Sequence, residues 1–342
     1  MEPEDTTSAV LRSVGVTKDR IASVAPLAGG TFNAVTRVSL TDGSDWVVKI
    51  PPPTTDGTLM SYERDLLVNE VEFYSCAGDS AAVPRVLHSE LDPDAPTGPY
   101  VIMSACPGRP WYDISGAAGD RVLSDAEERR LRNELGRIVA RLHSVTGTGG
   151  FGYPAGALGP PAPTWRQAFT AMTDAVLADA DTYRARLPRP AADIRALIAA
   201  ASPVLGDVTR PALVHFDLWQ GNLLVDGEPG ARTIGGIIDG ERMFWGDPVA
   251  DFVSLALFAN VEEDEDFLAG YGSGSGSGQP LVFDASVRLR LALYRCYLYL
   301  IMLVETVPRR VPQEHLDQVW KEVGPQLESA LADVEAALRA RD

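Results

Sequence analysis

Cysteine and long apolar runs are both scarce in this sequence of 342 residues. Its three cysteines, Cys76, Cys106 and Cys296, are far apart and form no Cys-x-x-Cys pair. We therefore expect neither a disulfide framework nor a zinc site, and a reducing cytoplasm fits this pattern. The apolar stretch at 296–304 (CYLYLIMLV) is too short to cross a bilayer, so we expect a buried helix there and no membrane contact. The N-terminus, MEPEDTTSAV, lacks the basic start and apolar core of a secretory signal.

Positive charge is also in short supply, with 30 lysines and arginines against 47 aspartates and glutamates and a net charge of −17. Nucleic-acid binding is therefore not expected, because a basic surface is the usual footprint of a protein that binds phosphate backbones. The acidity would suit a cationic small molecule, but solubility alone also explains it. The acidic run at 262–266 (EEDED) has the same two explanations, a binding wall or a solvated face.

Strands and turns alternate in the first hundred residues. The β-rich segments at 34–40 (AVTRVSL) and 45–50 (DWVVKI) flank the turn signal TDGS, which predicts a β-hairpin. A buried strand is expected at 100–104 (YVIMS), and the Pro/Gly-rich segment at 105–110 (ACPGRP) suits a hinge. The chain is long enough for a large core, which we expect to be split into two subdomains at this hinge.

A helical period runs from residue 62 to residue 77 and places Glu63, Glu70 and Tyr74 on one face. Apolar neighbours mark this face for burial, where an unpaired charge is costly. Glu70 therefore needs a cation, and Lys49 at the end of a predicted strand is the candidate.

The rest of the chain reads as mainly helical. Residues 124–144 begin with Ser124 as a helix N-cap and Glu127 at the capping-box position. The run at 270–280 (GYGSGSGSGQP) has the composition of a flexible connector. Further helices are expected at 165–180, 191–205, 251–260, 284–306 and 313–340.

The candidate catalytic residues are concentrated at 213–227 (LVHFDLWQGNLLVDG), where Asp217 and Asn222 lie between apolar runs. Another apolar run ends at Asp239, and a hairpin turning at 226–230 would bring Asn222 and Asp239 side by side. Two oxygen ligands would then face one point, as Mg²⁺ prefers when substrate phosphates and water complete its shell. Asp217 could orient an attacking hydroxyl and accept its proton, as phosphoryl transfer requires.

The pattern His215-x-Asp217-x₄-Asn222 followed by Ile238-Asp239 resembles the catalytic and metal loops of the aminoglycoside phosphotransferase and choline-kinase-like family of small-molecule kinases. Two other stretches are similar to segments of that family: LGRIVARLHSVTGTGGFGY at 135–153 and GDPVADF at 246–252.

This resemblance implies an α+β, protein-kinase-like fold with two lobes. The small β-rich N-lobe would comprise residues 1–104 and bind the nucleotide, and the larger, mainly helical C-lobe would comprise residues 105–342. The implied reaction is Mg²⁺-dependent transfer of the γ-phosphate of ATP or GTP to a hydroxyl of a small molecule. No activation segment ending in Ala-Pro-Glu follows Asp239, which disfavours a protein kinase.

The resemblance also implies the nucleotide site. Gly29, Gly30 and Thr31 would approach the phosphates through their backbone, and Lys49 would be the strand-three lysine that contacts the α- and β-phosphates, held by Glu70. The hinge would offer its backbone to the base, which leaves ATP and GTP both open. The implied hinge residues are Ser104 and Cys106, with Met103 behind the base.

Asp217 is the implied catalytic residue, and His215 is expected to brace its loop rather than to move protons. Many members of the family have glycine where Phe216 stands. Glu241 is a second metal or water-shell ligand, or a surface residue. Acceptor-binding candidates are Trp219, Glu241 and Trp245, although packing is the ordinary role of each tryptophan.

The acceptor follows least directly from the sequence. Antibiotic O-phosphorylation is our first interpretation. The alternatives are a housekeeping kinase of a sugar, amino sugar or amino alcohol, and a pseudokinase that only binds nucleotide. The oligomeric state stays open.

Overall fold

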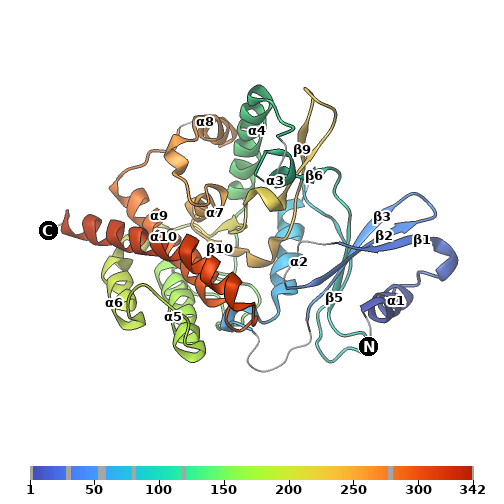
Figure 1. Ribbon diagram of the computed structural model, residues 1–342, viewed down its shortest axis with the longest axis horizontal. Coiled ribbons are helices and arrows are strands. Elements are labelled where there is room, and N and C mark those ends of the chain that lie inside the picture. The colour runs from blue at the N-terminus through green and yellow to red at the C-terminus, as the bar shows by residue number, and fades with distance from the viewer. Residues whose placement is uncertain are drawn as a thin grey trace.

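A sheet-rich N-terminal region and a larger, mainly helical C-terminal region make up the protein, as expected for the α+β class (Figure 1). This computed structural model describes residues 3–27, 32–52, 59–78, 82–117, 121–275 and 280–340. The N-terminal sheet is antiparallel, in the order β1-β2-β3-β5-β4. Its strands are β1 (Ile21–Pro26), β2 (Ala34–Leu40), β3 (Asp45–Ile50), β4 (Val86–Glu90) and β5 (Tyr100–Ser104).

The predicted hairpin is formed by β2 and β3, with Val35 opposite Lys49. One face of the sheet is covered by helix α1 (Pro3–Ser13), whose Val10 and Leu11 are fully buried in a small core with Val48. Lys49 follows Val48 directly, and side chains alternate between the faces of a strand. Lys49 therefore points to the opposite face, toward the C-terminal region.

Helix α2 (Leu66–Ala77) begins later than the helical period predicted. A short 3-10 helix (Ser61–Glu63) precedes it, and Asp65 between the two has a left-handed φ of 59°. The expectation that Glu63 shares a helix face with Glu70 is therefore wrong. Glu70 and Tyr74, both within α2, are buried together as expected.

Most of the predicted C-terminal helices are confirmed, including α4 (Asp125–Ser144) with Ser124 as N-cap and Glu127 in the capping box. The segment predicted helical at 191–205 changes to a 3-10 helix at Ser202–Asp207, and the one at 251–260 already ends at Leu255. No helix in the described ranges is long and apolar enough to span a membrane. The other helices are α3 (Trp111–Ile114), α5 (Trp165–Tyr183), α6 (Ala191–Ala201), α7 (Asp251–Leu255), α8 (Glu265–Gly274), α9 (Ala285–Val304) and α10 (Gln313–Arg339).

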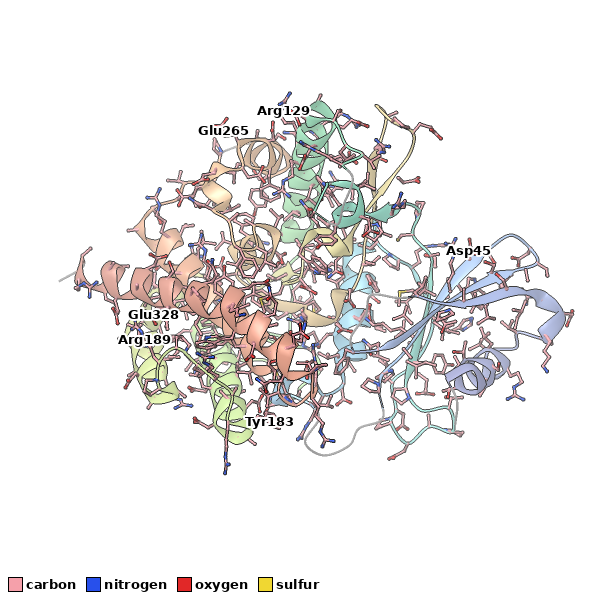
Figure 2. All side chains as sticks on the ribbon, viewed as in Figure 1. Asp45, Arg129, Tyr183, Arg189, Glu265 and Glu328 are labelled. Carbon is pink, nitrogen blue, oxygen red and sulfur yellow. The ribbon has the colours of Figure 1, made fainter. Side chains whose placement is uncertain are left out.

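The prediction of a flexible connector at 270–280 is partly wrong, because residues 270–274 form the end of α8. Their glycines serve close packing: a Cβ at Gly270 would collide with the backbone carbonyl of Asn133 on α4, and one at Gly274 would approach Arg137. Residues 276–279 lie outside the described ranges. Elsewhere on the helical region, Arg189 binds Glu328 of α10 at 2.7 Å (Figure 2).

Short strands carry the segment singled out for its chemistry. The predicted hairpin is formed by β8 (Leu223–Asp226) and β9 (Thr233–Ile237), and the Ile238 N–H donates to the Asn222 carbonyl over 3.0 Å. Strand β6 (Arg109–Pro110) pairs with β8, and β7 (Ala212–Val214) pairs with β10 (Phe244–Gly246).

Glu127 fastens this hairpin to α4 and provides a test of the fold. Its carboxylate accepts hydrogen bonds from Ser124 and, at 2.6 Å, from the Gly230 N–H in the hairpin turn. These bonds, the Gly230 N–H first, lower the pKa of Glu127 to about 2. A depressed carboxyl pKa stabilises the fold above the unfolded-state pKa, and this contribution is lost as the pH falls through the folded-state value.

We therefore predict that Glu127→Gln lowers the free energy of unfolding at pH 7 and that its difference from wild type shrinks as the pH falls from 5 to 2. Denaturant unfolding across this range measures the effect. Glu228→Gln, at an exposed residue of the same turn, is the control and should behave as wild type. A deficit of constant size at every pH would contradict the role of the charge.

Candidate active site

A loop between β7 and β8 carries Asp217, and helix α7 fixes its backbone. Asp251, at the start of α7, is fully buried and accepts hydrogen bonds from the N–H groups of His215 at 3.1 Å and Phe216 at 2.5 Å. Ser254, one turn later, accepts from the N–H of Leu218 at 3.0 Å. The loop is thus held by side chains that come after it in the chain. This role of Asp251 could not be predicted from the sequence, because its partners lie 35 and 36 residues earlier in the chain.

His215 is positioned as a brace. Its Nδ1 accepts from the Asp217 N–H at 3.1 Å, so its Nε2 carries the proton and donates to the Ile238 carbonyl at 3.0 Å. Burial lowers the pKa of His215, which keeps the ring neutral and suits this arrangement. Both ring nitrogens are occupied, which favours the bracing role over proton transfer.

Phe216 occupies a backbone conformation that ordinarily favours glycine. Its φ is 64°, and a left-handed conformation costs a residue with a side chain about 1–2 kcal/mol. Its ring is fully buried, with its centroid 5.0 Å from that of Phe244 and 5.6 Å from that of Tyr297. Burial of the ring offsets the backbone cost, which accounts for a bulky residue at a left-handed position.

Asp217 is half-buried and is positioned by Asn222. The Asn222 side-chain N–H₂ donates both to the Asp217 carbonyl and to its Oδ2, each at 2.9 Å. Burial raises the pKa of the Asp217 carboxyl to about 7, and the nearby Arg242 guanidinium opposes this shift. A carboxylate with such a pKa is a competent proton acceptor near neutral pH.

Lys49 lies at the centre of three carboxylates. Its Nζ is 2.9 Å from Glu70, 2.5 Å from Asp239 and 2.7 Å from Glu241, and its side chain is only 5% exposed. The expected Lys49–Glu70 pair is therefore present, with two partners that the sequence analysis did not foresee. Burial alone would lower the pKa of Lys49, but the three carboxylates outweigh it and hold the pKa well above its usual value.

Neighbouring polar groups order this cluster. The Tyr74 hydroxyl donates to Glu70 at 3.0 Å and accepts from the Asp239 N–H at 2.9 Å, so it links α2 to the loop that carries Asp239. Asn33 donates to the Glu241 carboxylate at 2.6 Å. Glu241 is buried, which rules out the surface alternative for it. The helical spacing of Tyr74 from Glu70 could indicate from the sequence that the two side chains are neighbours. The role of Asn33 could not be predicted, because its partner Glu241 lies 208 residues away.

The oxygen donors fit a magnesium ion that phosphates and water help to hold. The Asn222 amide nitrogen is committed to Asp217, which leaves its amide oxygen as the ligand atom, and the Asp239 side chain is 37% exposed. Within the described ranges, no group of three or more His, Cys, Asp or Glu side chains is arranged to hold a metal by itself. A site of this kind suits Mg²⁺, which usually keeps several waters and binds through one or two carboxylates plus substrate phosphates.

The expected hinge residues lie at the end of β5. Met103 is buried in β5, Ser104 ends the strand and accepts from the Arg85 N–H at 3.0 Å, and Cys106 follows. Burial raises the pKa of the Cys106 thiol to about 11, so it is neutral at physiological pH. The phosphate-approaching residues Gly29, Gly30 and Thr31 lie outside the described ranges.

The candidate acceptor tryptophans differ in exposure. Trp219, two residues after Asp217, is 36% exposed and meets Tyr112 edge to face with centroids 5.6 Å apart; Tyr112 is itself 38% exposed. Trp245 is buried in β10, and its ring lies where a Cβ at Gly147 would be. Trp219 therefore offers a surface for a ring, whereas Trp245 packs in the core.

A chain of alternating charges, absent from the sequence analysis, approaches Asp217 from the end of α9. Arg242 binds Glu305 at 2.7 Å, Glu305 binds Arg309 at 3.1 Å, and Arg309 binds Glu63. Only the three-dimensional structure brings together these residues from three distant segments.

Fold and site together define a kinase-like small-molecule phosphotransferase. The chain belongs to the phosphotransferase enzyme family (APH), whose model matches residues 23–287.

Several solved structures have the same fold at low sequence identity. A proposed fructosamine-3-kinase from Thermobifida fusca has a TM-score of 0.62 and 22% identity over 97% of this chain and 99% of that one. The GDP complex of aminoglycoside 2'-phosphotransferase-IIIa has a TM-score of 0.60 and 19% identity over 97% and 99%. A macrolide 2'-phosphotransferase from Brachybacterium faecium has a TM-score of 0.55 and 18% identity over 97% and 98%. These likenesses establish the fold alone.

We predict that Lys49→Met destabilises the protein in a pH-dependent way. Removing one partner from a buried ion pair costs about 3–5 kcal/mol, because the other charge stays buried. Without Lys49 the pKa values of Glu70 and Asp239 should rise in the folded state, so stability is lost as the pH rises. Unfolding measured at pH 5 and pH 8 should show the larger deficit at pH 8. Lys49→Arg keeps the charge and is the control; equal deficits at both pH values would contradict the prediction.

Proposed function

We propose that the protein transfers the γ-phosphate of ATP or GTP, with Mg²⁺, to a hydroxyl of a ring-bearing small molecule. The main support for this proposal is the ion pair between Lys49 and Asp239, which lies next to the loop that holds Asp217. A phosphate-binding cation, a metal ligand and a proton acceptor are thereby collected from the two regions of the chain, as phosphoryl transfer requires.

In the proposed reaction the acceptor's oxygen forms a bond to the γ-phosphorus, the bond from that phosphorus to the nucleotide's bridging oxygen breaks, and Asp217 takes the hydroxyl proton. His215 and Asn222 orient Asp217. Lys49, steadied by Glu70, pairs with the phosphates. Gly29, Gly30 and Thr31 would approach the phosphates, and the hinge at Met103, Ser104 and Cys106 would take the base.

Asn222 and Asp239 would hold Mg²⁺, with Glu241 as an additional carboxylate. A bound Mg²⁺ neutralises negative charge on the phosphates. Glu241 is thereby assigned to the metal and phosphate side of the site rather than to the acceptor, because its carboxylate already pairs with Lys49. A catalytically silent pseudokinase is disfavoured, because the set Lys49, Glu70, Asp217, Asn222 and Asp239 is intact.

The acceptor is proposed to be an antibiotic that is phosphorylated in the cytoplasm, with its ring placed against Trp219 and Tyr112. The acidic run at 262–266 does not favour a cationic acceptor, since Glu262 is already paired with Arg288 and Asp264 with Arg132. The aromatic pair suits the sugar ring of an antibiotic and the ring of a sugar or amino sugar equally well. Kinase activity on such a metabolite is therefore the second candidate.

We predict that Asp217→Asn lowers turnover about 10²–10⁴-fold, the usual contribution of a positioned base, and leaves folding and nucleotide binding intact. The purified protein is incubated with Mg²⁺, ATP or GTP, and aminoglycosides, macrolides, nucleoside and peptide antibiotics, amino sugars or choline. Mass spectrometry then detects the gain of one phosphate. Near-normal turnover by Asp217→Asn would remove Asp217 from the catalytic role.

The same panel separates the two acceptor classes. If an antibiotic is phosphorylated, expression in a sensitive bacterium should raise resistance, and Asp217→Asn should abolish the protection. If sugars or choline are phosphorylated and no antibiotic is, the antibiotic proposal fails and the metabolite kinase replaces it.

We also predict that Asn222→Ala and Asp239→Ala raise the Mg²⁺ concentration needed for half-maximal activity by about 10–100-fold or more, since even indirect partners of a metal contribute that much. Titrating Mg²⁺ at fixed nucleotide measures the change. Asp226→Ala, at an exposed carboxylate of the same hairpin, is the matched control. An unchanged metal requirement in both ligand variants would show that the metal site lies elsewhere.

A further inference from the structure

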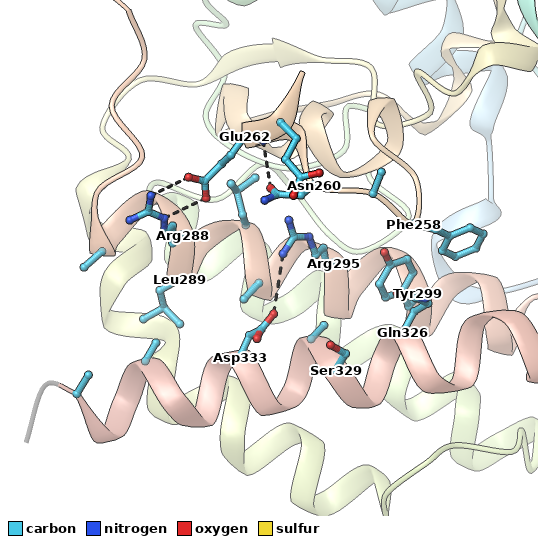
Figure 3. Close-up of a pocket in the computed structure, with 18 residues that line it drawn as sticks. Phe258, Asn260, Glu262, Arg288, Leu289, Arg295, Tyr299, Gln326, Ser329 and Asp333 are labelled. Carbon is cyan, nitrogen blue, oxygen red and sulfur yellow. Dashed lines mark hydrogen bonds and ion pairs between the residues drawn. The ribbon is translucent and has the colours of Figure 1, made fainter. Parts of the chain in front are cut away.

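The loop that follows α9 contacts the N-terminal region of the chain. Within α9 itself, Arg295 pairs with Asp333 of α10 at 4.0 Å, in a groove whose lining includes none of the residues assigned to catalysis (Figure 3). Arg309, which comes after the end of α9, lies instead over the ring of Phe32. Its guanidinium carbon is 5.5 Å from the ring centre, within the distance of about 6 Å over which a cation and an aromatic face attract.

Acidic neighbours hold the Arg309 guanidinium in this orientation. Its Nη2 binds Glu63, whose side chain is fully buried, and Glu305 at 3.1 Å. The Nε–H is buried and has no hydrogen-bond partner among the described residues. Because the Arg309 side chain is only 17% exposed and paired with two carboxylates, Phe32 packs on a support of defined position.

The residue after Phe32 has a second contact with the C-terminal region. The Asn33 Nδ2 donates to Glu241 at 2.6 Å, and Glu241 pairs with Lys49 at 2.7 Å. Phe32 and Asn33 directly follow Thr31, the last of the residues predicted to approach the phosphates. The chain is therefore held at two successive residues just after the predicted phosphate contact.

The segment that begins with Phe32 is also tied to Lys49. It leads into β2, where Ala34 is paired with Ile50 of β3, the residue next to Lys49. A displacement of Phe32 would therefore move this segment relative to the Lys49 ammonium. Both are parts of the chain that the proposed reaction places next to the nucleotide.

We propose that Arg309 is a positioning residue for the nucleotide, acting through Phe32. The proposal rests on the proposed function, because it requires that a nucleotide binds beside Lys49. Arg309 touches no reacting atom. It keeps the start of β2 in its place before the nucleotide arrives, so the cost of ordering this segment does not reduce the binding affinity. Loss of the contact should raise the Kd and the KM of the nucleotide and leave the chemical step at Asp217 intact.

The test uses the full chain, with calorimetric titration of Mg²⁺–ATP and Mg²⁺–GTP and with steady-state kinetics on the acceptor that the panel identifies. Phe32→Leu removes the aromatic face but keeps an apolar side chain and all ion pairs of Arg309. We expect the nucleotide Kd and KM to rise about three- to tenfold, the contribution of a partly buried cation–π contact, and kcat to stay near its wild-type value. Phe32→Tyr keeps the ring and should bind the nucleotide as the wild type does.

Arg309→Gln should raise the nucleotide Kd by a similar factor. The double variant with Phe32→Leu should show no further rise, because both substitutions remove the same contact. Arg290→Gln is the matched control: Arg290 of α9 also pairs with a buried carboxylate, that of Asp247, but contacts no residue assigned to the nucleotide. This control should lower the melting temperature and leave the nucleotide Kd unchanged.

The outcomes separate this proposal from the proposed function. If the wild type binds neither nucleotide, both fail together. If the wild type binds a nucleotide and transfers phosphate, but Phe32→Leu only lowers the melting temperature and leaves Kd and KM unchanged, the positioning role of Arg309 alone is overturned. An equal rise in Kd for Arg290→Gln would also overturn it, since the effect would then follow from general destabilisation.

Discussion

The ion pairs of Lys49 are the interaction on which the two regions of this protein depend. The ammonium group of Lys49 on β3 meets Glu70 of α2 and also Asp239, which lies 190 residues after Lys49 in the chain. A lysine that is only 5% exposed is tolerated because carboxylates surround it. The position of the N-terminal sheet over the catalytic loop is therefore set by the same charges that the proposed chemistry uses.

The catalytic loop depends in turn on a buried carboxylate outside its own motif. Asp251 accepts from two N–H groups of the loop and also contacts His143 at 2.9 Å. His143 is bonded to Tyr271 of α8 at 2.9 Å, so the loop is connected through Asp251 to α4 and α8. These buried hydrogen bonds fix the backbone that carries Asp217, and a fixed geometry is what a proton acceptor in phosphoryl transfer would need.

Features with a local cause could be predicted from the sequence. The capping box of Ser124 and Glu127, both hairpins and the pairing of Lys49 with Glu70 follow from short-range periodicity and from the cost of a buried charge. Features set by distant partners could not be predicted. In the sequence, the glycines near Gly270 resemble a linker, but in the structure they belong to a helix that packs closely against α4. Likewise, no sequence motif predicts the ion pair of Glu305 with Arg242. The residues proposed to act in phosphate transfer were thus identifiable from the sequence, whereas most of the residues that position them were not.

Phe216 makes the conformation of the loop around Asp217 depend on the packing of the core. A glycine at this position would adopt the left-handed φ without steric cost, and the loop would then not depend on how the surrounding core packs. In this chain the turn is kept by the burial of one ring between Phe244 and Tyr297. A substitution of Phe244 or Tyr297 would therefore disturb the backbone next to Asp217, although neither ring belongs to the loop.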